Sequence, residues 1–510
     1  MNSELNKHEK VISQDPHMPG DYAALLGEYS KQELDSIAQL KRFFEWIQGD
    51  KDFCTRVEYG NFSPEIIERL RRIGITYDLD EVSLLWKDPN TFLQYLENYR
   101  DDNQDELPSK IVESLNNYPL LALWTRFIVS KQKLFDTLRK QIVAVPLQPK
   151  YDFWRQRRIA SVRSELGYYG YHINHPVLSF ELSDGCSMGC WFCAFAAHKL
   201  KGIFDYRENR ESFRDIVQIC VNLFGKYHAG KAMLYCGTEP HDNPNYLDFL
   251  EDYAEITGFP PFTATVVATD KKWFRDLVEF YRRGPYSLLR LSVLSKPILY
   301  KIHEMYSSQE LRDVDLLMQM KDYPRQKVAS GRILADEDGL RSRKNGQYAD
   351  AVVPQGSIEC MSGFLINMAK KTIQLISPCY SCSKWSHGYR IFDKTTFSGA
   401  ADFLSAIEYL IDCNMPELPP SDRNVSFRDD LICRPGDEGF DLISPNQVHH
   451  FKGKEIYGAL GKLITGKPLT YNELYDSMMN TYGISPMVSV SVVKKLFDNG
   501  FLDEVNPAEK

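Results

Sequence analysis

Short apolar segments alternate with amphipathic helical segments through the middle of this 510-residue chain. The helical patterns include 212–228 and 271–284, and the expected strands are 177–183, 231–237, 263–270, 288–295 and 327–333. Strands that alternate with helices predict a parallel sheet made of right-handed crossovers, either open or closed into a barrel. In such folds the functional residues lie on loops that leave the carboxyl ends of the strands.

Three cysteines lie in the loop that follows the first expected strand. Cys186, Cys190 and Cys193 have the spacing Cys-x3-Cys-x2-Cys. A structural zinc site takes four ligands, and an iron–sulfur cube also takes four. His198 is the best local alternative as a further zinc ligand. Without it, three thiolates on a cube would leave one iron free to bind another molecule.

The stretch CSMGCWFC, with Phe192 before the last cysteine, resembles the signature of the radical S-adenosylmethionine (SAM) enzymes. The resemblance implies a [4Fe-4S] cluster held by Cys186, Cys190 and Cys193, with SAM chelated by the open iron. It implies that SAM is cleaved to a 5′-deoxyadenosyl radical, which abstracts hydrogen from the substrate; this chemistry belongs to the cofactor. It also implies a partial (β/α)6 TIM-like barrel of the radical SAM type within the α/β class.

Further positions resemble the cofactor pocket of that superfamily. Gly237, Thr238 and Glu239 precede Pro240 and are similar to a Gly-Gly-Glu-Pro motif that holds the SAM amino group, with Thr238 replacing the second glycine. An ordinary turn ended by proline is the alternative interpretation.

Ser292 and Arg332 are weaker matches to the same pocket. Ser292 lies where the superfamily often contacts the SAM ribose or carboxylate, and Arg332 could reach the carboxylate. A strand hydroxyl and a surface arginine, neither with a function, are the alternatives.

The order of DGCSMGCWFCAF, CGTEPHDNPNY, GSIECMSGFLINMAKKTIQLISPC and HGYRIF resembles the peptide epimerases that mature proteusin-type ribosomal natural products. Members convert L-residues of a precursor peptide to D-residues. The radical removes the Cα hydrogen, and a cysteine thiol returns hydrogen from the opposite face. We expect Cys360 to be this donor, and a small buried apolar side chain is the alternative. Cys379 and Cys382 could supply the donor, ligate a second cluster or be structural.

Two other functions stay open at this stage. A different radical SAM peptide-modifying enzyme, which forms C–C or thioether crosslinks, would carry the same cysteine motif. A non-catalytic zinc or Fe–S binding protein would hold a metal without consuming SAM.

The chain is expected to contain four regions. Residues 1–150 form a helical N-terminal domain, either a cap on the barrel or a leader-like segment, and 151–395 form the barrel core. Residues 396–440 form a helical extension and linker, because 414–440 is rich in proline and charge. Residues 441–510 form a winged-helix-like module, in which Thr470 and Glu473 make a capping box. The module resembles small winged-helix elements that bind leader peptides by adding a strand to a sheet edge. DNA binding is the alternative, which the few basic residues of HHFKGKEIYGALGKLI disfavour.

Charge and hydropathy limit the partners and the location. With 61 basic against 69 acidic residues, the chain lacks the positive charge of a nucleic-acid-binding protein. No apolar run reaches the ~20 residues that span a bilayer. The segment MNSELNKHEKVISQD lacks the apolar core of a signal peptide, so we expect a cytoplasmic chain without a membrane partner. The resemblance implies a precursor peptide with a leader, and an electron donor of the flavodoxin or ferredoxin type.

Overall fold

The computed structural model describes residues 22–100, 117–144, 147–283, 289–320, 328, 330–335, 357 and 359–505. These parts of the chain are mixed α/β, as the alternating pattern predicted. They divide into two compact units. Unit 1 comprises 1–144 and 262–325, and unit 2 comprises 145–261 and 326–510. The expected barrel core is therefore shared between two units, and most of the expected helical domain shares its unit with 262–325.

Helices make up the first part of unit 1. They are α2 (Tyr22–Gly27), α3 (Lys31–Gly49), α4 (Lys51–Glu58), α5 (Pro64–Arg72), η1 (Leu79–Val82), α6 (Leu84–Lys87), α7 (Pro89–Arg100) and α9 (Pro119–Ala144). Helix α3 buries the apolar side chains of Ile37, Leu40 and Phe43, and Ser30 and Glu33 close a capping box at its start. Ser63 precedes α5, and Gly74 follows it with φ +86.

A small parallel sheet completes unit 1. Its strands are β4 (Thr263–Thr265), β5 (Leu289–Val293) and β6 (Asp315–Met318), in that order. Helices α13 (Lys271–Arg283), α14 (Lys296–Met305) and α15 (Ser308–Leu311) connect and follow them. Helix α3 packs against α14, α15 and β6. The sequence predicted β4 and β5 but missed β6.

Unit 2 contains a mixed sheet of order β1-β7-β8-β9. Strand β1 (Leu178–Glu181) pairs in parallel with β7 (Gly363–Asn367), and β8 (Thr372–Pro378) and β9 (Tyr389–Thr396) continue the sheet antiparallel. The short strands β2 (Ser183–Asp184) and β3 (Gly202–Ile203) form a separate pair.

Two expected strands of unit 2 were wrong. The segment 231–237 makes a single parallel bridge, between Met233 and Ser179, because the chain turns at Tyr235, whose carbonyl accepts from the amide of Thr238. In the described part of 327–333, Arg332 begins the short helix α16 (Arg332–Ala335). Gly331 precedes it with φ +54, which is not a strand conformation.

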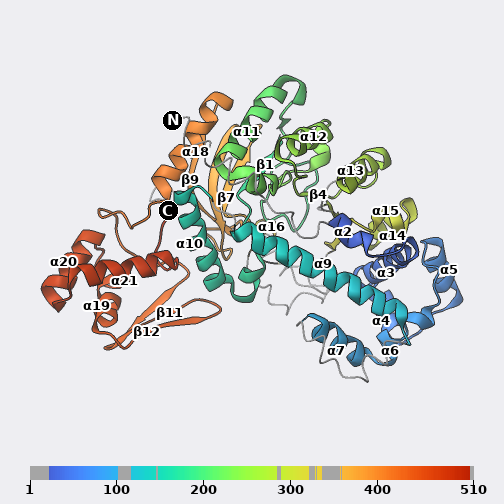
Figure 1. Ribbon diagram of the computed structural model, residues 1–510, viewed down its shortest axis with the longest axis horizontal. Helices are drawn as coiled ribbons and strands as arrows, with labels where there is room; N and C mark the ends of the chain where they lie inside the picture. Colours follow the sequence, from blue (N-terminus) through green and yellow to red (C-terminus); the bar gives the residue numbers. More distant parts are fainter. Residues whose placement is uncertain are drawn as a thin grey trace. The chain divides into compact units, whose positions relative to one another are not determined.

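Long helices pack against the β1-β7-β8-β9 sheet. They are α10 (Pro149–Leu166), α11 (Tyr206–Gly230) and α18 (Ala400–Asn414), which contact one another, and α10 and α18 both contact β8 (Figure 1). The 3₁₀ turn η3 (Gly167–His172) follows α10. The 3₁₀ turn η4 (Pro240–Asp242) and helix α12 (Tyr246–Thr257) follow α11, and α12 packs on α11.

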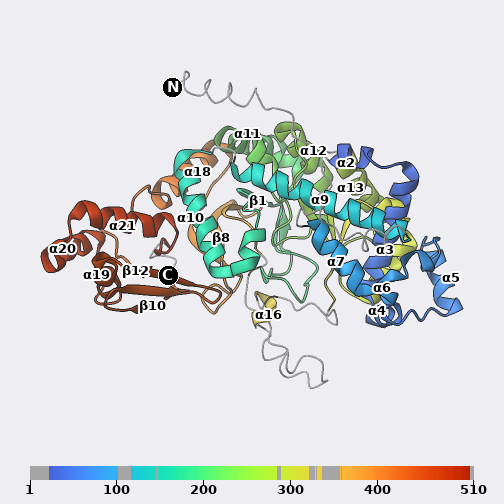
Figure 2. The same cartoon turned by 60° about the horizontal axis from the view of Figure 1, so that its bottom comes forward.

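The C-terminal module has a three-stranded antiparallel sheet with helices on one side (Figure 2). Its elements are β10 (Ile432–Pro435), β11 (Gly439–Ile443), β12 (Val448–Lys452), α19 (Glu455–Ile464), α20 (Tyr471–Tyr482) and α21 (Pro486–Asp498). The capping box of Thr470 and Glu473 is confirmed. The core of the module begins at Val425 and includes Leu431, so part of the expected linker 414–440 is folded into the module.

Across the described residues, no helix is long and apolar enough to cross a membrane.

Candidate active site around the cysteine loop

The cysteine loop, residues 185–201, connects β2 to β3. Backbone hydrogen bonds close it. The amide of Cys186 donates to the carbonyl of His198 at 2.9 Å, and the amide of Cys193 donates to the carbonyl of Cys190 at 3.2 Å. The side chains of Cys186, Cys190 and Cys193 are half-buried. The structure therefore places the three predicted ligands in one closed loop near the carboxyl end of β1.

Two residues from outside the loop hold it in shape. The amide of Ser187 donates to Asp242 Oδ2 at 2.9 Å. The guanidinium of Arg332 donates to the carbonyl of Cys190 at 2.8 Å and also to the carbonyl of Ala197. The amide of Arg332 donates to the carbonyl of Cys193 at 3.0 Å. Arg332 thus braces the backbone of the cysteine loop, a role that the sequence did not suggest.

The electrostatics of the loop suit a cation. Burial raises the pKa of Cys190 to about 11, and the neighbouring Cys186, Cys193 and Glu239 charges add to the shift. Burial also raises the pKa of Cys186, with the charges of Asp242 and Glu239 acting in the same direction. Thiolates crowded with carboxylates lose their protons readily when a metal ion or cluster offsets the charge. The donor set therefore fits an iron–sulfur cluster. No preformed group of three or more His, Cys, Asp or Glu ligands exists in the described parts of the chain.

His198 was the local candidate for a fourth ligand. Its Nε2 lies 2.9 Å from Asp184 Oδ1, and its Nδ1 lies 2.8 Å from the carbonyl of Lys199. Lys370 also contacts Asp184, at 2.9 Å. Both ring nitrogens thus have partners other than the cysteine sulfurs, which disfavours the zinc alternative.

The Gly237-Thr238-Glu239 turn lies beside the cysteine loop. Gly237 has φ +67, and a Cβ there would lie 2.3 Å from Glu181 Oε1, so glycine is required. Glu239 is buried, and its carboxylate accepts from the amide of His241 at 3.2 Å. The negative charge of Glu239 contributes to the raised pKa values of both Cys186 and Cys190. The structure therefore brings this predicted acid together with the cysteine loop.

Sequence reasoning missed Glu181, the last residue of β1. Burial raises its pKa to about 7, and the amide of Asn367 donates to its Oε2 at 2.7 Å. A carboxyl group at the carboxyl end of a strand that leads into the cysteine loop was the available signal.

Cys360 lies just before β7, and its side chain is half-buried. Its carbonyl accepts from the amide of His175 at 3.1 Å, and its own amide donates to Glu359 Oε1 at 2.8 Å. Glu359 is buried, and burial raises its pKa to about 7. Cys360 Sγ lies 3.7 Å from Met233 Sδ, beside β1. Neither Glu359 nor Met233 was singled out from the sequence.

The remaining predicted residues lie in different surroundings. Ser292 is buried on β5, in unit 1, whereas the cysteine loop belongs to unit 2. The Phe192 ring packs edge-on against Trp191. Cys379 is buried, whereas Cys382 is exposed and its sulfur accepts from the amide of Trp385 at 3.4 Å.

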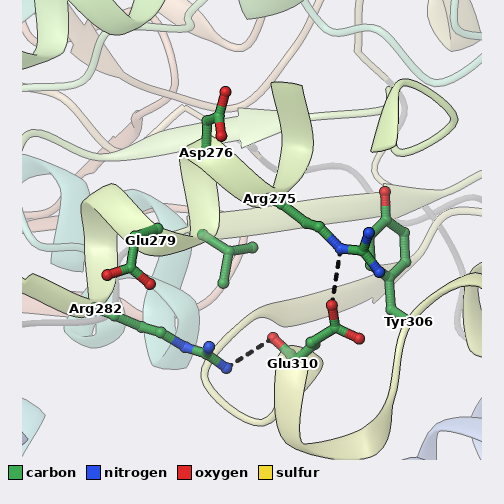
Figure 3. A pocket seen from close by; sticks show the side chains of 7 residues that line it. Arg275, Asp276, Glu279, Arg282, Tyr306 and Glu310 are labelled. Carbon is green, nitrogen blue, oxygen red and sulfur yellow. Dashed lines mark hydrogen bonds and ion pairs between the residues drawn. The ribbon is translucent and has the colours of Figure 1, made fainter. Parts of the chain in front are cut away.

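A separate cavity of about 290 Å³ lies in unit 1, between α13 and α15 (Figure 3). Its arginines are bonded within the cavity wall. Arg275 Nε donates to Glu310 Oε1 at 2.9 Å, and Arg282 donates to the carbonyl of Gln309 at 2.6 Å. The Glu310 carboxylate neutralises Arg275, and a main-chain carbonyl occupies the Arg282 guanidinium. We therefore assign no function to this cavity.

Comparison with known proteins gives one full-length relative. The chain is 31% identical over 488 residues to the uncharacterized protein y4wI of Sinorhizobium fredii, an alignment that covers 94% of this chain and 91% of that protein. The chain belongs to the y4wI family. No family model matches it, and no solved structure matches it. Membership of the y4wI family names no activity, so a functional proposal depends on the site itself.

Proposed function

We propose that this member of the y4wI family is a radical SAM peptide epimerase, which converts L-residues to D-residues in a ribosomally made precursor peptide. The observation that carries the proposal is the closed loop with Cys186, Cys190 and Cys193, beside which Glu239 lies. We also propose the finer fold that the resemblance implies, a partial (β/α)6 TIM-like barrel, and parallel strand pairing within each unit supports it.

The cofactors of this proposal are a [4Fe-4S] cluster and SAM. Cys186, Cys190 and Cys193 would hold the cluster, and the bound cofactors would supply a 5′-deoxyadenosyl radical. Glu239 would accept a hydrogen bond from the SAM ammonium, since it is a buried carboxylate within the field of the cysteine loop. Arg332 would keep the loop closed around the cluster.

Gly237, Thr238 and Phe192 would complete the proposed SAM pocket in unit 2. Gly237 would permit close approach of the backbone, because it carries no Cβ and has a positive φ. The contacts of Thr238 and Phe192 with SAM follow from the superfamily resemblance alone, and no SAM contact is assigned to Ser292, which lies on β5 in unit 1.

Cys360 would return hydrogen to the substrate radical. A planar Cα radical inverts only when its hydrogen donor stands on the face opposite to the adenosyl group. A thiol S–H bond is weak enough to supply that hydrogen atom. The half-buried Cys360 combines a thiol with partial access from outside the core.

Anaerobic reconstitution followed by reaction with a candidate precursor tests the proposal. A brown protein that releases 5′-deoxyadenosine and yields D-residues, read by chiral amino-acid analysis in heavy water, is the expected result. A colourless zinc protein would contradict the proposal. A peptide product lighter by two hydrogens would indicate a crosslinking enzyme instead.

Two sets of variants sharpen this test. We expect Cys186→Ala, Cys190→Ala and Cys193→Ala each to lose iron and 5′-deoxyadenosine formation together. We expect Cys360→Ala to keep both and to lose D-residue formation. Cys413→Ala, at an exposed cysteine on α18, is the matched control and should behave as the unmodified chain. D-residue formation by Cys360→Ala would remove this thiol from the reaction.

We further propose that the C-terminal module binds the precursor leader. Strand β12 is one of the two edge strands in the order β10-β11-β12, and an edge strand can accept an added strand. A groove of about 240 Å³ lies beside it, between β12 and α21. The groove is lined by apolar and basic side chains, namely His450, Phe451, Lys452, Tyr457, Val492, Lys495 and Leu496. An extended leader with apolar and acidic residues suits this lining.

A charge placed in the groove tests leader binding. We expect Val492→Glu to weaken binding of a labelled precursor at least tenfold, measured by fluorescence anisotropy. Such a change repels an acidic peptide and removes an apolar contact. Met479→Glu, at an exposed position on α20, is the control. Equal affinity for both variants would rule out this groove. A flavodoxin- or ferredoxin-type donor remains the proposed reductant.

A further inference from the structure

Three sulfur atoms meet in the core of unit 2. Cys360 Sγ lies 3.7 Å from Met233 Sδ, and Cys236 Sγ lies 3.8 Å from the same atom, each thiol being placed to donate a hydrogen bond. Met233 and Cys236 are each 3% exposed, whereas Cys360 is half-buried. Two thiols therefore share one thioether acceptor, one of them closed off from solvent and the other partly open.

The backbone fixes this sulfur cluster of Met233, Cys236 and Cys360. Met233 makes the parallel bridge with Ser179 of β1, and Cys236 follows it at the turn before Gly237. The backbone of Cys360 is held at two points: its amide donates to Glu359 Oε1, and its carbonyl accepts from the amide of His175. Burial raises the pKa of Cys236 well above its usual range, so Cys236 keeps its S–H bond at neutral pH.

We propose that Cys236 is a second hydrogen donor, which restores the Cys360 thiol after Cys360 has given its own hydrogen to the substrate. This inference rests on the proposed epimerase function. In the step, the S–H bond of Cys236 breaks, the S–H bond of Cys360 forms, and the unpaired electron moves from the sulfur of Cys360 to that of Cys236. Neither a proton nor an electron enters or leaves in this step; one electron from the proposed flavodoxin- or ferredoxin-type donor and one proton from water would then restore the Cys236 thiol before the next turnover. The two bonds are of the same type, so the transfer is close to thermoneutral.

Moving the radical to Cys236 would lower the fraction of time that a sulfur radical spends next to the product, and so would slow the reverse reaction. A peptide Cα–H bond and a thiol S–H bond are of comparable strength, so a sulfur radical next to the product can take the hydrogen back. Cys236 is shielded from the peptide by burial, and a radical there cannot reach the product. Met233 is then a positioning residue, because its sulfur holds both thiols in place.

The sulfur cluster can be tested without any reaction. Infrared spectroscopy of the resting protein resolves S–H stretching bands, which shift when the hydrogen-bond acceptor changes. We expect Met233→Leu, which keeps the volume of the side chain, to shift the bands that Cys236→Ser and Cys360→Ser remove. The band of Cys220, a fully buried thiol on α11, should not move and is the internal control. Unshifted bands in Met233→Leu would contradict the statement that Met233 Sδ accepts hydrogen bonds from both thiols.

The reaction arm uses Cys236→Ser, which keeps a small polar side chain but has no weak S–H bond. We expect Cys236→Ser to form 5′-deoxyadenosine as fast as the unmodified enzyme. Over many turnovers we expect the ratio of D-residue to 5′-deoxyadenosine to fall, because the Cys360 radical takes hydrogen back from the product. Cys413→Ser is the control. An unchanged ratio in Cys236→Ser, with a normal unfolding midpoint, would overturn the proposal.

Failure of the two ideas can be distinguished. If the unmodified enzyme forms no D-residue with a bound precursor, the epimerase proposal falls and the relay falls with it, while the infrared arm still reports on the sulfur cluster. If the unmodified enzyme inverts residues and Cys236→Ser does so with equal coupling, the epimerase proposal stands and the relay alone is refuted.

Discussion

At the scale of single residues, Gly331 shows how the absence of a side chain shapes the cysteine loop. A Cβ at this position would lie 2.2 Å from the carbonyl oxygen of Ala194 and 2.3 Å from that of Cys193, and φ is +54. We expect Gly331→Ala to lower the free energy of unfolding by about 1–3 kcal/mol and to lower the iron bound per chain, because the loop must move away. Urea unfolding and iron analysis after reconstitution measure the two effects.

Gly258 offers the matched comparison. It also has a positive φ, +81, but an added Cβ would have no neighbour within 4 Å. Gly258→Ala should therefore show only the backbone strain, about 1 kcal/mol, with full iron content. Equal iron content in the two variants would contradict the close packing of Gly331 on the loop.

Two buried carboxyl groups near the proposed site predict a dependence of stability on pH. Burial raises the pKa of Glu181 and of Glu359 from 4.5 to about 7. Between pH 4.5 and 7 the folded chain binds more protons than the unfolded chain. The contribution of the two carboxyl groups to the unfolding free energy is therefore complete below pH 4.5 and is lost as pH rises towards 7. The pKa shift of each carboxyl group corresponds to a contribution of roughly 3 kcal/mol to the unfolding free energy at low pH.

Neutral variants test this contribution. Glu181→Gln and Glu359→Gln should each reduce the fall in unfolding free energy between pH 4.5 and 7, relative to the unmodified chain, in urea titrations at several pH values. Glu408→Gln, at an exposed position on α18, should leave the pH profile unchanged. Profiles of Glu181→Gln and Glu359→Gln that match the unmodified chain would mean that these carboxyls are ionised in the fold.

At the scale of elements, buried ion pairs attach helix α10 to the end of the C-terminal module. Glu504 is buried and accepts from Arg157 through Nε and Nη2, at 3.0 and 2.7 Å to Oε2, and also from Arg158. Removing one partner of a buried ion pair leaves an uncompensated charge. We therefore expect Glu504→Ala to lower the unfolding free energy by about 3–5 kcal/mol in urea titrations.

An exposed ion pair is the control for this prediction. Lys494 and Asp498 lie one turn apart on α21, with Nζ 2.6 Å from Oδ2, and both side chains are more than 40% exposed. Asp498→Ala should cost less than about 1 kcal/mol. Similar costs at the two positions would show that Glu504 is solvated.

The sequence predicted helices better than strands, for a physical reason. Helix α3 and helix α20 each have a periodic apolar pattern and a capping box, and both signals lie within one short stretch of the sequence. Strand β6 has four residues, too few for a period, and its pairing partner β5 lies elsewhere in the chain. The segment around Gly331 looked like a strand, but its conformation is set by contact with Cys193.

The same distinction applies to the candidate site. The spacing of Cys186, Cys190 and Cys193 is local, so the sequence reveals it directly. The bracing by Arg332 and the meeting of Cys236 with Cys360 depend on residues more than 100 positions apart, which no local pattern records.

At the scale of the whole molecule, each of the two units is made of two segments that are separated in the sequence. Unit 1 joins residues before 144 to the segment 262–325. Within it, Trp46 Nε1 donates to His303 Nδ1 at 2.7 Å, and Arg42 donates to the carbonyl of Tyr306 at 2.7 Å. The N-terminal helices are therefore part of the core around β4, β5 and β6 and are not a separable domain.

Deleting residues 1–144 tests this organisation. We expect the amides of β5 and β6 to lose protection in hydrogen-exchange mass spectrometry, because α3 no longer covers the neighbouring helices. Strands β7 and β8 of unit 2 provide the internal comparison and should stay protected. Retained protection in β5 and β6 would support an independent N-terminal domain.

The bracing of the cysteine loop by Arg332 also has a consequence for biogenesis. The loop backbone at Cys190 and Cys193 receives its hydrogen bonds from Arg332, and the amide of Gly331 is in turn tied to the carbonyl of Ser386. A ribosome must therefore translate almost two hundred further codons after Cys193 before all these bracing bonds can form. Insertion of the proposed cluster into the fully braced loop would accordingly be a late, largely post-translational event for this polypeptide.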